Sequence, residues 1–431
     1  MNSIKNSLND LKYFIILWLS QSFSSLGSAM TNFALVIWSY QQYGSALQTA
    51  MITICSYSPY VIMSIFAGAL SDRWNKKITM LVCDSFAAIC TVCVILLLKS
   101  NSLQIWHIYL LNALNGLMGT LQQPSADVTI SLLTPEKYYQ KASAMRSLSN
   151  SLTSVLTPVI ATVLYSFSGL KAVILFDLFT FFIAFFCLLF FIKIPKFNYS
   201  DKKDEGVLES AKIGLRYLKD NRGILDLFLF LAAINLIASM YNAAFPAMIL
   251  SKSANGEFDL GIANTVIGLS TLLGSIIVSI LPVPKSRVKV ICNTLLFSMS
   301  TENFFLAFGQ SLPLWSIGAA LGWIFIPVMG ANMEALLRHH IPIELQGRVF
   351  SARNTFQFFT IPIGYFLGGF LVDKVFEPFM STQNDSIFNT LFGVGKGSGA
   401  AFLFLILAFS GIAVCLFFRK DTHLWELEKD K

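Results

Sequence analysis

Charged side chains are scarce in this chain of 431 residues. Asp, Glu, Lys and Arg make up 13% of it, whereas soluble domains usually carry about a quarter. Hydrophobic types make up 55%. Lipid offers no partner to an unpaired backbone group, and a core of about 30 Å takes about 20 apolar residues per helix. The composition therefore excludes an ordinary soluble protein and predicts an all-α polytopic membrane protein.

Residues that could form disulfides or hold metals are also few. The seven Cys all lie in or beside apolar runs, which argues against a disulfide framework or a zinc site. Cys90 and Cys93 make a CxxC pair inside one such run, where we interpret them as small packing residues. The four His show no metal-ligand spacing, and the adjacent His339 and His340 cannot share one helix face. We therefore expect no metal and no cofactor.

A nucleotide-binding loop is missing too. In the Gly-rich stretch 393–399, no Gly stands five residues before Gly395, and Lys396 is followed by Gly397 where Ser or Thr would be needed. ATP is therefore not expected as the energy source. The net charge of +7 is spread over many short loops, which argues against a nucleic-acid partner.

Twelve apolar runs are predicted to cross the membrane as helices. They are residues 13–38, 47–70, 78–98, 104–124, 145–167, 171–192, 223–250, 260–281, 288–309, 313–336, 350–373 and 399–418. Positive charge is retained on the cytoplasmic side of short loops. Placing both termini inside puts 26 of the 31 Lys and Arg on that side. The sequence thus predicts twelve spans with both ends cytoplasmic.

A polar segment divides the spans into two groups of six. Residues 193–222 hold eight Lys or Arg, and apolar residues recur there at helical spacing, which predicts an amphipathic helix at the inner membrane surface. We therefore predict an N-terminal six-helix bundle at 1–192, a cytoplasmic linker at 193–222 and a C-terminal six-helix bundle at 223–431.

The two halves look related, as in transporters built from repeats. A constant offset of 207 residues pairs acid with acid, proline with proline and base with base. It maps Asp127 to Glu334, Pro135 to Pro342, Lys141 to Arg348 and Arg146 to Arg353, and it also maps Ser28 to Asn235. This ungapped series predicts two pseudo-symmetric bundles.

The turn after the second span carries the most specific motif in the chain. It reads Gly68-Ala69-Leu70-Ser71-Asp72-Arg73-Trp74-Asn75-Lys76-Lys77. This resembles the Gly-x-x-x-Asp-Arg-x-x-Arg/Lys-Arg/Lys signature of the major facilitator superfamily, with Asn75 where Gly is commoner. The resemblance implies the major facilitator fold. It also implies a gating motif made of Gly68, Asp72, Arg73, Lys76 and Lys77, in which Asp72 meets the start of helix 11. A solvated turn that only sets the topology is the alternative.

Within that superfamily the chain resembles the macrolide-efflux type of bacterial drug exporter. The matching segments are Trp18-x-x-Gln21 with Gly27-Ser28, Gln122-Gln123-Pro124, Ile341-Pro342 and Gly347-Arg348-Val349-Phe350-Ser351. Two departures concern proton coupling. Helix 4 lacks the Arg of many proton-coupled members, and Thr157-Pro158 lacks the flanking glycines of the helix 5 pattern. Proton antiport is implied by the family and is not secured by these residues.

The repeated acids and bases form two candidate gating charge pairs. Asp127 with Arg146, and Glu334 with Arg353, would bracket the inner ends of helices 4 and 5 and of helices 10 and 11. A partly desolvated pair could latch the inner side, since breaking it leaves an uncompensated charge that costs about 3–5 kcal/mol. An exposed pair would contribute less than about 1 kcal/mol.

Polar residues at helical spacing are candidates for contact with a substrate. They are Gln21, Ser25, Ser28 and Asn32 on helix 1, Asn112, Asn115 and Gln122 on helix 4, and Asn235, Ser239 and Asn242 on helix 7. A bundle interior lined in this way could hold a large amphiphile with many hydrogen-bonding groups. Hydrogen bonding between helices is the alternative role for such residues.

Acidic residues inside a span are costly and are functional candidates by default. Asp177 and Glu302 are the clearest two, and both are predicted in the outer part of the membrane. Either could take up a proton from outside, because burial disfavours the charged form. The alternative is a hydrogen-bonded acid at a packed helix interface.

These observations together favour a secondary active efflux transporter in a bacterial inner or plasma membrane, and not an enzyme. Its cargo would be a hydrophobic or amphiphilic small molecule, macrolide-like by resemblance, exchanged for protons by alternating access. We expect a monomer in the lipid bilayer. Two alternatives stay open: an exporter of a native metabolite, siderophore or lipid-like molecule, and a non-transporting membrane receptor or scaffold.

Overall fold

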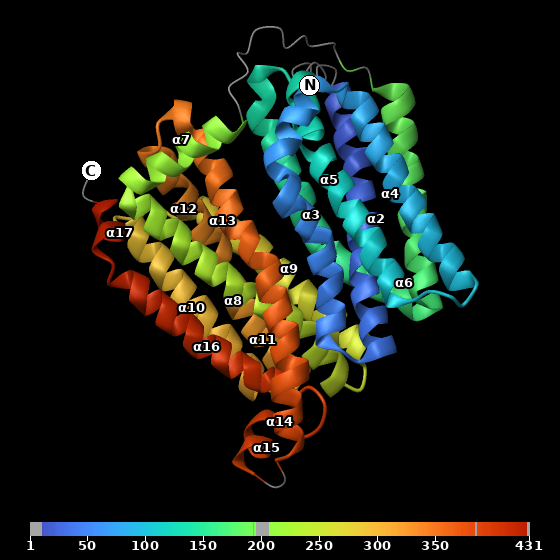
Figure 1. The fold of residues 1–431 in the computed structure, drawn as a ribbon, viewed down its shortest axis with the longest axis vertical. Helices are drawn as coiled ribbons and strands as arrows, with labels where there is room; N and C mark the ends of the chain where they lie inside the picture. Colours follow the sequence, from blue (N-terminus) through green and yellow to red (C-terminus); the bar gives the residue numbers. More distant parts are fainter. Residues whose placement is uncertain (1–10, 193, 195–206, 384–385, 429–431) are drawn as a thin grey trace. The chain divides into compact units, whose positions relative to one another are not determined.

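The computed structural model describes residues 11–192, 194, 207–383 and 386–428. Every regular element in these ranges is a helix (Figure 1). In the first half, four predicted spans correspond to α2 (Lys12–Tyr43), α3 (Ala46–Arg73), α4 (Lys76–Lys99) and α5 (Ile105–Leu133). Each of these spans is therefore one continuous helix.

The fifth and sixth spans are joined without a polar loop. A short 3-10 turn, η1 (Glu136–Tyr138), leads into α6 (Tyr139–Phe186), and a π-helical turn, η2 (Cys187–Phe191), ends it. The backbone leaves helical geometry at Ser168 and Gly169, where φ is −150° and +61°. Glycine tolerates the positive φ at this point, so the chain reverses there and one long stretch supplies two spans.

The second half contains single, broken and short helices. Spans seven, eight, nine and twelve are α8 (Arg222–Lys252), α9 (Gly256–Ile280), α10 (Arg287–Phe308) and α16 (Ser398–Arg419). The tenth consists of α11 (Leu312–Trp323) and α12 (Ile326–His340), and the eleventh of α13 (Ile343–Phe370) with the π-helical turn η3 (Leu371–Phe376). Shorter helices are α7 (Val207–Asp220) in the central polar segment, α14 (Glu377–Ser381), α15 (Ile387–Phe392) and α17 (Thr422–Glu426).

The helices group into two compact units. The described residues of 1–38 and 55–204 form the first unit, and those of 39–54 and 205–428 form the second. The end of α2 and the first turns of α3 thus pack with the second unit. The boundaries predicted from the sequence, with a linker at 193–222, stay a prediction.

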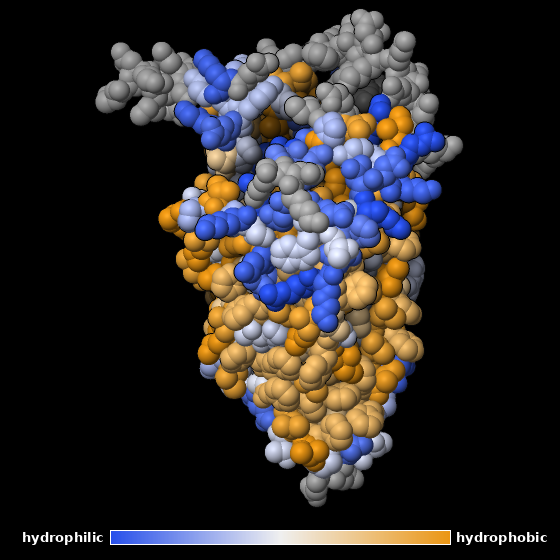
Figure 2. Space-filling view, turned by 90° about the vertical axis from the view of Figure 1, so that its left-hand side faces the viewer, coloured by the Kyte–Doolittle hydropathy of each residue, from blue (hydrophilic) through white to orange (hydrophobic). Residues whose placement is uncertain are grey.

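The architecture confirms the predicted fold class, an all-α membrane protein with twelve spans in two bundles. Among the described residues, seven helical stretches are each long and apolar enough to cross a membrane, and one of them, Tyr139–Phe191, holds two predicted spans. Figure 2 shows apolar side chains around the middle of the visible face and hydrophilic ones gathered toward one end. Large apolar side chains such as Phe409 and Phe417 are exposed, as expected for contact with lipid.

The start of α4 is held by side chains of the motif region. The Asn75 side chain caps the helix by accepting a hydrogen bond from the Ile78 N–H at 3.2 Å. The Lys77 ammonium donates to the carbonyl oxygens of Leu189 and Ile192 at 2.9 and 2.7 Å. These carbonyls lie at the end of the sixth span, so Lys77 ties α4 to η2.

Two glycines allow helices of the first unit to approach closely. A Cβ on Gly27 of α2 would lie 2.2 Å from the Thr180 hydroxyl oxygen of α6. A Cβ on Gly116 of α5 would lie 2.0 Å from the Ser56 carbonyl oxygen of α3. Both distances are below van der Waals contact, so α2 and α6, and α3 and α5, can pack this closely only because these positions lack a side chain.

Candidate substrate cavity

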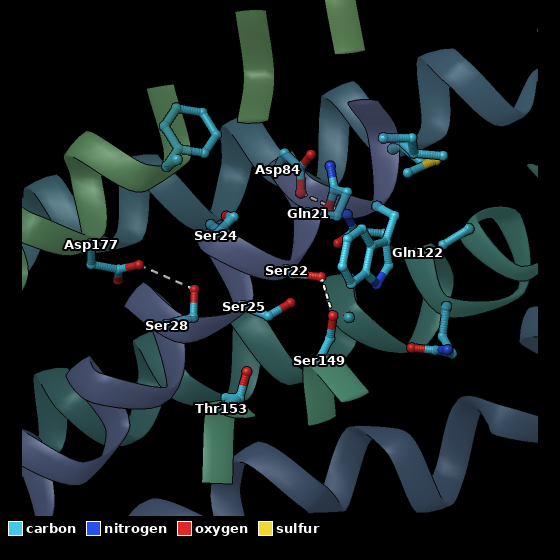
Figure 3. A pocket seen from close by; sticks show the side chains of 18 of the residues that line it. Gln21, Ser22, Ser24, Ser25, Ser28, Asp84, Gln122, Ser149, Thr153 and Asp177 are labelled. Carbon is cyan, nitrogen blue, oxygen red and sulfur yellow. Dashed lines mark hydrogen bonds between the residues drawn. The ribbon is translucent and has the colours of Figure 1, made fainter. Parts of the chain in front are cut away.

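The first unit contains a cavity of about 510 Å³ between α2, α4, α5 and α6 (Figure 3). Hydroxyl, amide and carboxylate groups point into it from all four helices. The polar lining residues labelled in Figure 3 are Gln21, Ser22, Ser24, Ser25, Ser28, Asp84, Gln122, Ser149, Thr153 and Asp177. Arg146 at the start of α6 also lines it and is partly exposed, so the cavity reaches the end of the unit where α5 meets α6.

A second cavity of about 340 Å³ adjoins the first. The two share the lining residues Ser28, Ala87, Thr91, Gly119, Gln122 and Asp177. The second cavity is also lined by Asn32, Asn112 and Asn115. Together the two cavities place polar groups along much of the length of the first unit.

The structure brings together all seven lining residues predicted in the first half. Gln21, Ser25, Ser28 and Gln122 line the larger cavity, and Ser28, Asn32, Asn112, Asn115 and Gln122 line the smaller one. The Asn112 amide also donates to the Ile108 carbonyl of its own helix at 2.9 Å. Their role in binding a substrate stays a proposal.

The three predicted lining residues of the second half lie on α8. Ser239 is buried, and a Cβ on Gly364 of α13 would lie 2.5 Å from the Ser239 Cβ. At this point α8 is therefore in close contact with α13. Asn235 and Asn242 are half-buried on the same helix, and their contact with a substrate stays a prediction.

Asp177 is held by two hydroxyl groups from α2. Its Oδ1 accepts a hydrogen bond from Ser28 at 3.2 Å, and its Oδ2 accepts one from Thr31 at 2.9 Å. The side chain is 6% exposed and lines both cavities. Asp177 thus combines features of both sequence interpretations: it joins two packed helices, and it faces a space that a proton or a ligand could reach.

Glu302 lies in the interior of the second unit. Its Oε1 accepts a hydrogen bond from the Trp323 indole N–H at 2.9 Å, and the residue is 4% exposed. A Cβ on Gly322 would lie 2.2 Å from Oε2. The glycine therefore leaves room for the carboxylate between α10 and α11.

The predicted charge pairs are both formed, and both join residues that are 19 positions apart. Arg146 donates to Asp127 at 2.7 Å, with side chains 43% and 45% exposed. Arg353 donates to Glu334 at 3.2 Å, with side chains 18% and 37% exposed. Arg338 also contacts Glu334, at 2.9 Å. The second pair is more buried and has a third member, so we expect it to contribute more to stability than the first.

The gating motif is only partly described. The backbone of Gly68, Asp72 and Arg73 continues α3 to its end, and the side chains of Asp72 and Arg73 lie outside the described part of the structure. Lys76 is buried and Lys77 binds the carbonyls at the end of η2. The gating role of these five residues stays a prediction.

Asp84 of α4 is a lining residue that the sequence interpretation missed. Its Oδ1 accepts a hydrogen bond from the Gln122 amide at 2.6 Å (Figure 3). The available signal was an acid inside the predicted span 78–98, of the same kind that singled out Asp177 and Glu302. Because the sequence does not show which face of α4 meets α2 and α5, it did not connect Asp84 to Gln21 and Gln122.

A bundle of apolar helices with a polar cavity in its interior, as in the first unit, is typical of membrane transporters. The Major Facilitator Superfamily profile matches residues 17–288, more than half of the chain, and the chain belongs to this superfamily. Macrolide efflux protein A of Streptococcus pyogenes is 22% identical over 371 residues, which are 85% of this chain and 90% of that protein. Multidrug efflux pump Tap of Mycolicibacterium fortuitum is 22% identical over 77% of this chain and 82% of that one.

The fold is also similar to those of solved transporters. A bacterial homologue of the iron transporter ferroportin, in an inward-facing state, aligns with a TM-score of 0.69 at 15% identity. The alignment covers 95% of this chain and 99% of that one. At this level of identity the likeness supports the fold alone.

Proposed function

We propose that this chain is a secondary active efflux transporter of a bacterial plasma membrane, with both termini in the cytoplasm. It exports hydrophobic or amphiphilic small molecules with many hydrogen-bonding groups, a class that includes macrolide-like drugs. The observation that carries the proposal is the cavity of about 510 Å³ lined by polar groups from four helices of the first unit. A polar interior surrounded by apolar helices suits a cargo that has both kinds of surface.

Efflux, rather than uptake, is supported by relatives. The proteins named Macrolide efflux protein A and Multidrug efflux pump Tap match over most of their length. Their identity of 22% leaves the cargo of this chain open. The cargo class therefore rests on the lining of the cavity as well as on these names.

Protons are the proposed coupling ion, and Asp177 is the first candidate for carrying them. It lines both cavities, so a proton could reach it without unfolding a helix. Its two hydroxyl partners can reorient when the carboxyl gains a proton, because a hydroxyl both donates and accepts. Glu302, sealed between α10 and α11, is the second candidate.

Reconstituted transport tests this proposal. Purified protein is placed in proteoliposomes, a pH gradient is imposed, and the movement of a panel of macrolides and other amphiphiles is followed. We expect uphill movement of at least one compound that stops when the gradient is collapsed. Movement that ignores the pH gradient, or follows only a sodium gradient, would contradict proton antiport.

Two neutral variants then test where the proton binds. Asp177→Asn is expected to abolish gradient-driven accumulation while leaving downhill exchange of the compound. Glu302→Gln is expected to abolish gradient-driven accumulation only if Glu302, in the second unit, carries the proton. If both variants keep uphill transport, neither acid is the coupling site. A panel in which no compound moves would favour a receptor or scaffold.

A further inference from the structure

The Asp84 carboxylate has no assigned role in the proposed transport cycle. It projects from α4 into the larger cavity of the first unit, beside the amide of Gln21 (Figure 3). Its Oδ1 is occupied by the Gln122 amide. Its Oδ2 is buried and has no hydrogen-bond partner within the described part of the chain. Nε2 of the adjacent Gln21 also makes no hydrogen bond of normal geometry, although the Gln21 side chain lies close enough to interact with the Asp84 carboxylate.

An unpartnered carboxylate oxygen in a bundle interior needs a physical explanation. Buried polar atoms in native proteins nearly always form a hydrogen bond. A buried donor or acceptor without one costs about 1–3 kcal/mol, and more if the group is charged. Asp84 meets this condition in the wall of the larger cavity, where a ligand could supply the missing donor once the neighbouring side chains shift away from the buried oxygen. The position of the free oxygen therefore points to a bound group that donates a hydrogen bond.

The charges around the cavity favour a cation as this group. Three charged residues line it, namely Asp84, Asp177 and Arg146. Arg146 already pairs with Asp127 at 2.7 Å, and both oxygens of Asp177 accept hydroxyl hydrogen bonds. Asp84 is thus the lining acid that has a free oxygen and forms no ion pair within the described residues.

The internal repeat shows that the bundle fold does not need an acid at this position. The offset of 207 residues maps Asp84 to Ile291, and aligning the N-caps Asn75 and Ser286 maps it to Leu295. Ile291 and Leu295 are both buried apolar residues. The second unit therefore packs this part of its third helix with an aliphatic side chain, so the helix packing of such a bundle does not require an acid here.

We propose that Asp84, with Gln21 and Gln122 beside it, binds the ammonium or similar cationic nitrogen of the transported compound. The inference rests on the proposed export function and specifies its substrate class as cationic amphiphiles. The cationic head would lie against Oδ2 of Asp84, and the apolar body would lie along the ring of Trp18 and the side chain of Phe181, which line the same cavity. A Ca²⁺ or Mg²⁺ ion fits less well, since these ions require six or more oxygen ligands.

Equilibrium binding to the purified full-length protein in detergent tests the proposal without any gradient. The probes are rhodamine 6G, a permanent cation with N–H donors, and Nile red, a neutral dye of similar ring size, both followed by fluorescence polarisation. We expect Asp84→Asn to weaken rhodamine 6G binding at least tenfold and to change Nile red binding less than threefold. Asp84→Glu restores the charge and should keep rhodamine 6G binding within about threefold. Asp220→Asn, an exposed change on α7, serves as the matched control.

Several results would overturn the assignment. The first is that the unaltered protein does not bind rhodamine 6G. The second is that Asp84→Asn binds rhodamine 6G as tightly as the unaltered protein does. The third is that Asp84→Asn loses affinity for both dyes to the same extent. If Asp84→Asn does not fold, the unaltered protein is treated with dicyclohexylcarbodiimide and analysed by mass spectrometry. Protection of Asp84 by rhodamine 6G but not by Nile red supports the site, and labelling that is unchanged by rhodamine 6G rules it out.

This binding test separates the site from the transport mechanism. If the charge-selective binding holds while proteoliposomes show no uphill movement, the proposed export function fails and the cation site stands. If a neutral compound is exported while Asp84→Asn binds rhodamine 6G normally, export stands and the cation site fails.

Discussion

Asp373 caps the first turn of α3 by accepting a hydrogen bond from the backbone N–H of Ala46 at 3.0 Å. The same carboxylate accepts from the Leu47 N–H at 2.9 Å and from the Ser45 hydroxyl at 2.5 Å. The acid lies in the π-helical turn η3, at the end of α13. Gly369, one turn earlier, permits the close approach, because a Cβ there would lie 2.6 Å from the Leu47 Cα. An anion at a helix N-terminus is favourable because it meets unpaired N–H groups and the positive end of the helix dipole.

Replacing Asp373 tests how much this cap contributes. Asp373→Ala removes the acceptor for two backbone N–H groups, and losing a helix cap typically costs about 0.5–2 kcal/mol. We expect the amides of Ala46 and Leu47 to exchange with deuterium several-fold to about thirtyfold faster. Ser45→Ala leaves these two backbone hydrogen bonds in place but removes the acceptor of the Gln48 N–H, so it should speed exchange of the Gln48 amide and affect Ala46 and Leu47 less. Unchanged exchange in Asp373→Ala would show that other groups hold this turn.

The two charge pairs should differ in their contribution to stability. Arg146 and Asp127 are nearly half exposed, so Arg146→Ala should lower the free energy of unfolding by less than about 1 kcal/mol. Arg353 is 18% exposed and contacts Glu334, so Arg353→Ala should cost about 1.5–3 kcal/mol. Chemical or thermal unfolding of the two variants and the unaltered protein in the same detergent measures both losses of stability. Equal losses in the two variants would contradict the difference in burial as the cause.

Two glycines on α5 should respond to substitution in opposite ways. A Cβ on Gly119, which lines both cavities, would meet no atom within 4 Å. We expect Gly119→Ala to fold well, with a gain of up to about 1 kcal/mol from helix propensity, and Gly119→Phe to fold but block transport by filling the cavity. Gly116→Ala is the contrasting variant, because its Cβ would lie 2.0 Å from the Ser56 carbonyl oxygen.

Measurements of melting temperature and of transport together test the predictions for Gly116 and Gly119. Gly116→Ala should lower the melting temperature by several degrees, since helix α5 must move away from α3. Normal transport by a folded Gly119→Phe protein would show that the cargo does not pass through this cavity.

The gating motif is tested by Asp72→Asn. This change removes one charge and keeps the shape of the side chain, so we expect normal expression and substrate binding but transport reduced at least tenfold. The control is Trp74→Phe, an exposed position within the same turn. If Asp72→Asn exports at the normal rate, the motif sets topology only.

The sequence was a good guide to features that repeat or that belong to one helix. Apolar runs marked the spans, because each must be long enough to cross the lipid. The offset of 207 residues pointed to Asp127 with Arg146 and to Glu334 with Arg353, and in each pair the two side chains meet. Both predictions follow from patterns along the chain, the length of the apolar runs and the repeat between the halves, which the sequence itself displays.

The sequence was a poor guide to which helix faces meet. Asp84 looked like one more polar residue within a span, and its link to Gln21 and Gln122 appears only when α2, α4 and α5 are placed around one cavity. Asp373 is similar: it lies about 330 residues from the turn it caps. Contacts between residues so distant in sequence depend on the rotation of each helix about its axis, which a pattern of apolar residues fixes only loosely.

By itself, the sequence determined that this chain crosses the membrane many times in two related halves, and it pointed to the superfamily. Those properties follow from the lack of charge, the length of the apolar runs and one charged turn. Only the tertiary structure decided which polar groups share a cavity and which acid within it keeps a free oxygen. The physical reason is that helix packing, through close contacts such as those at Gly27 and Gly116, sets the direction in which each polar side chain points.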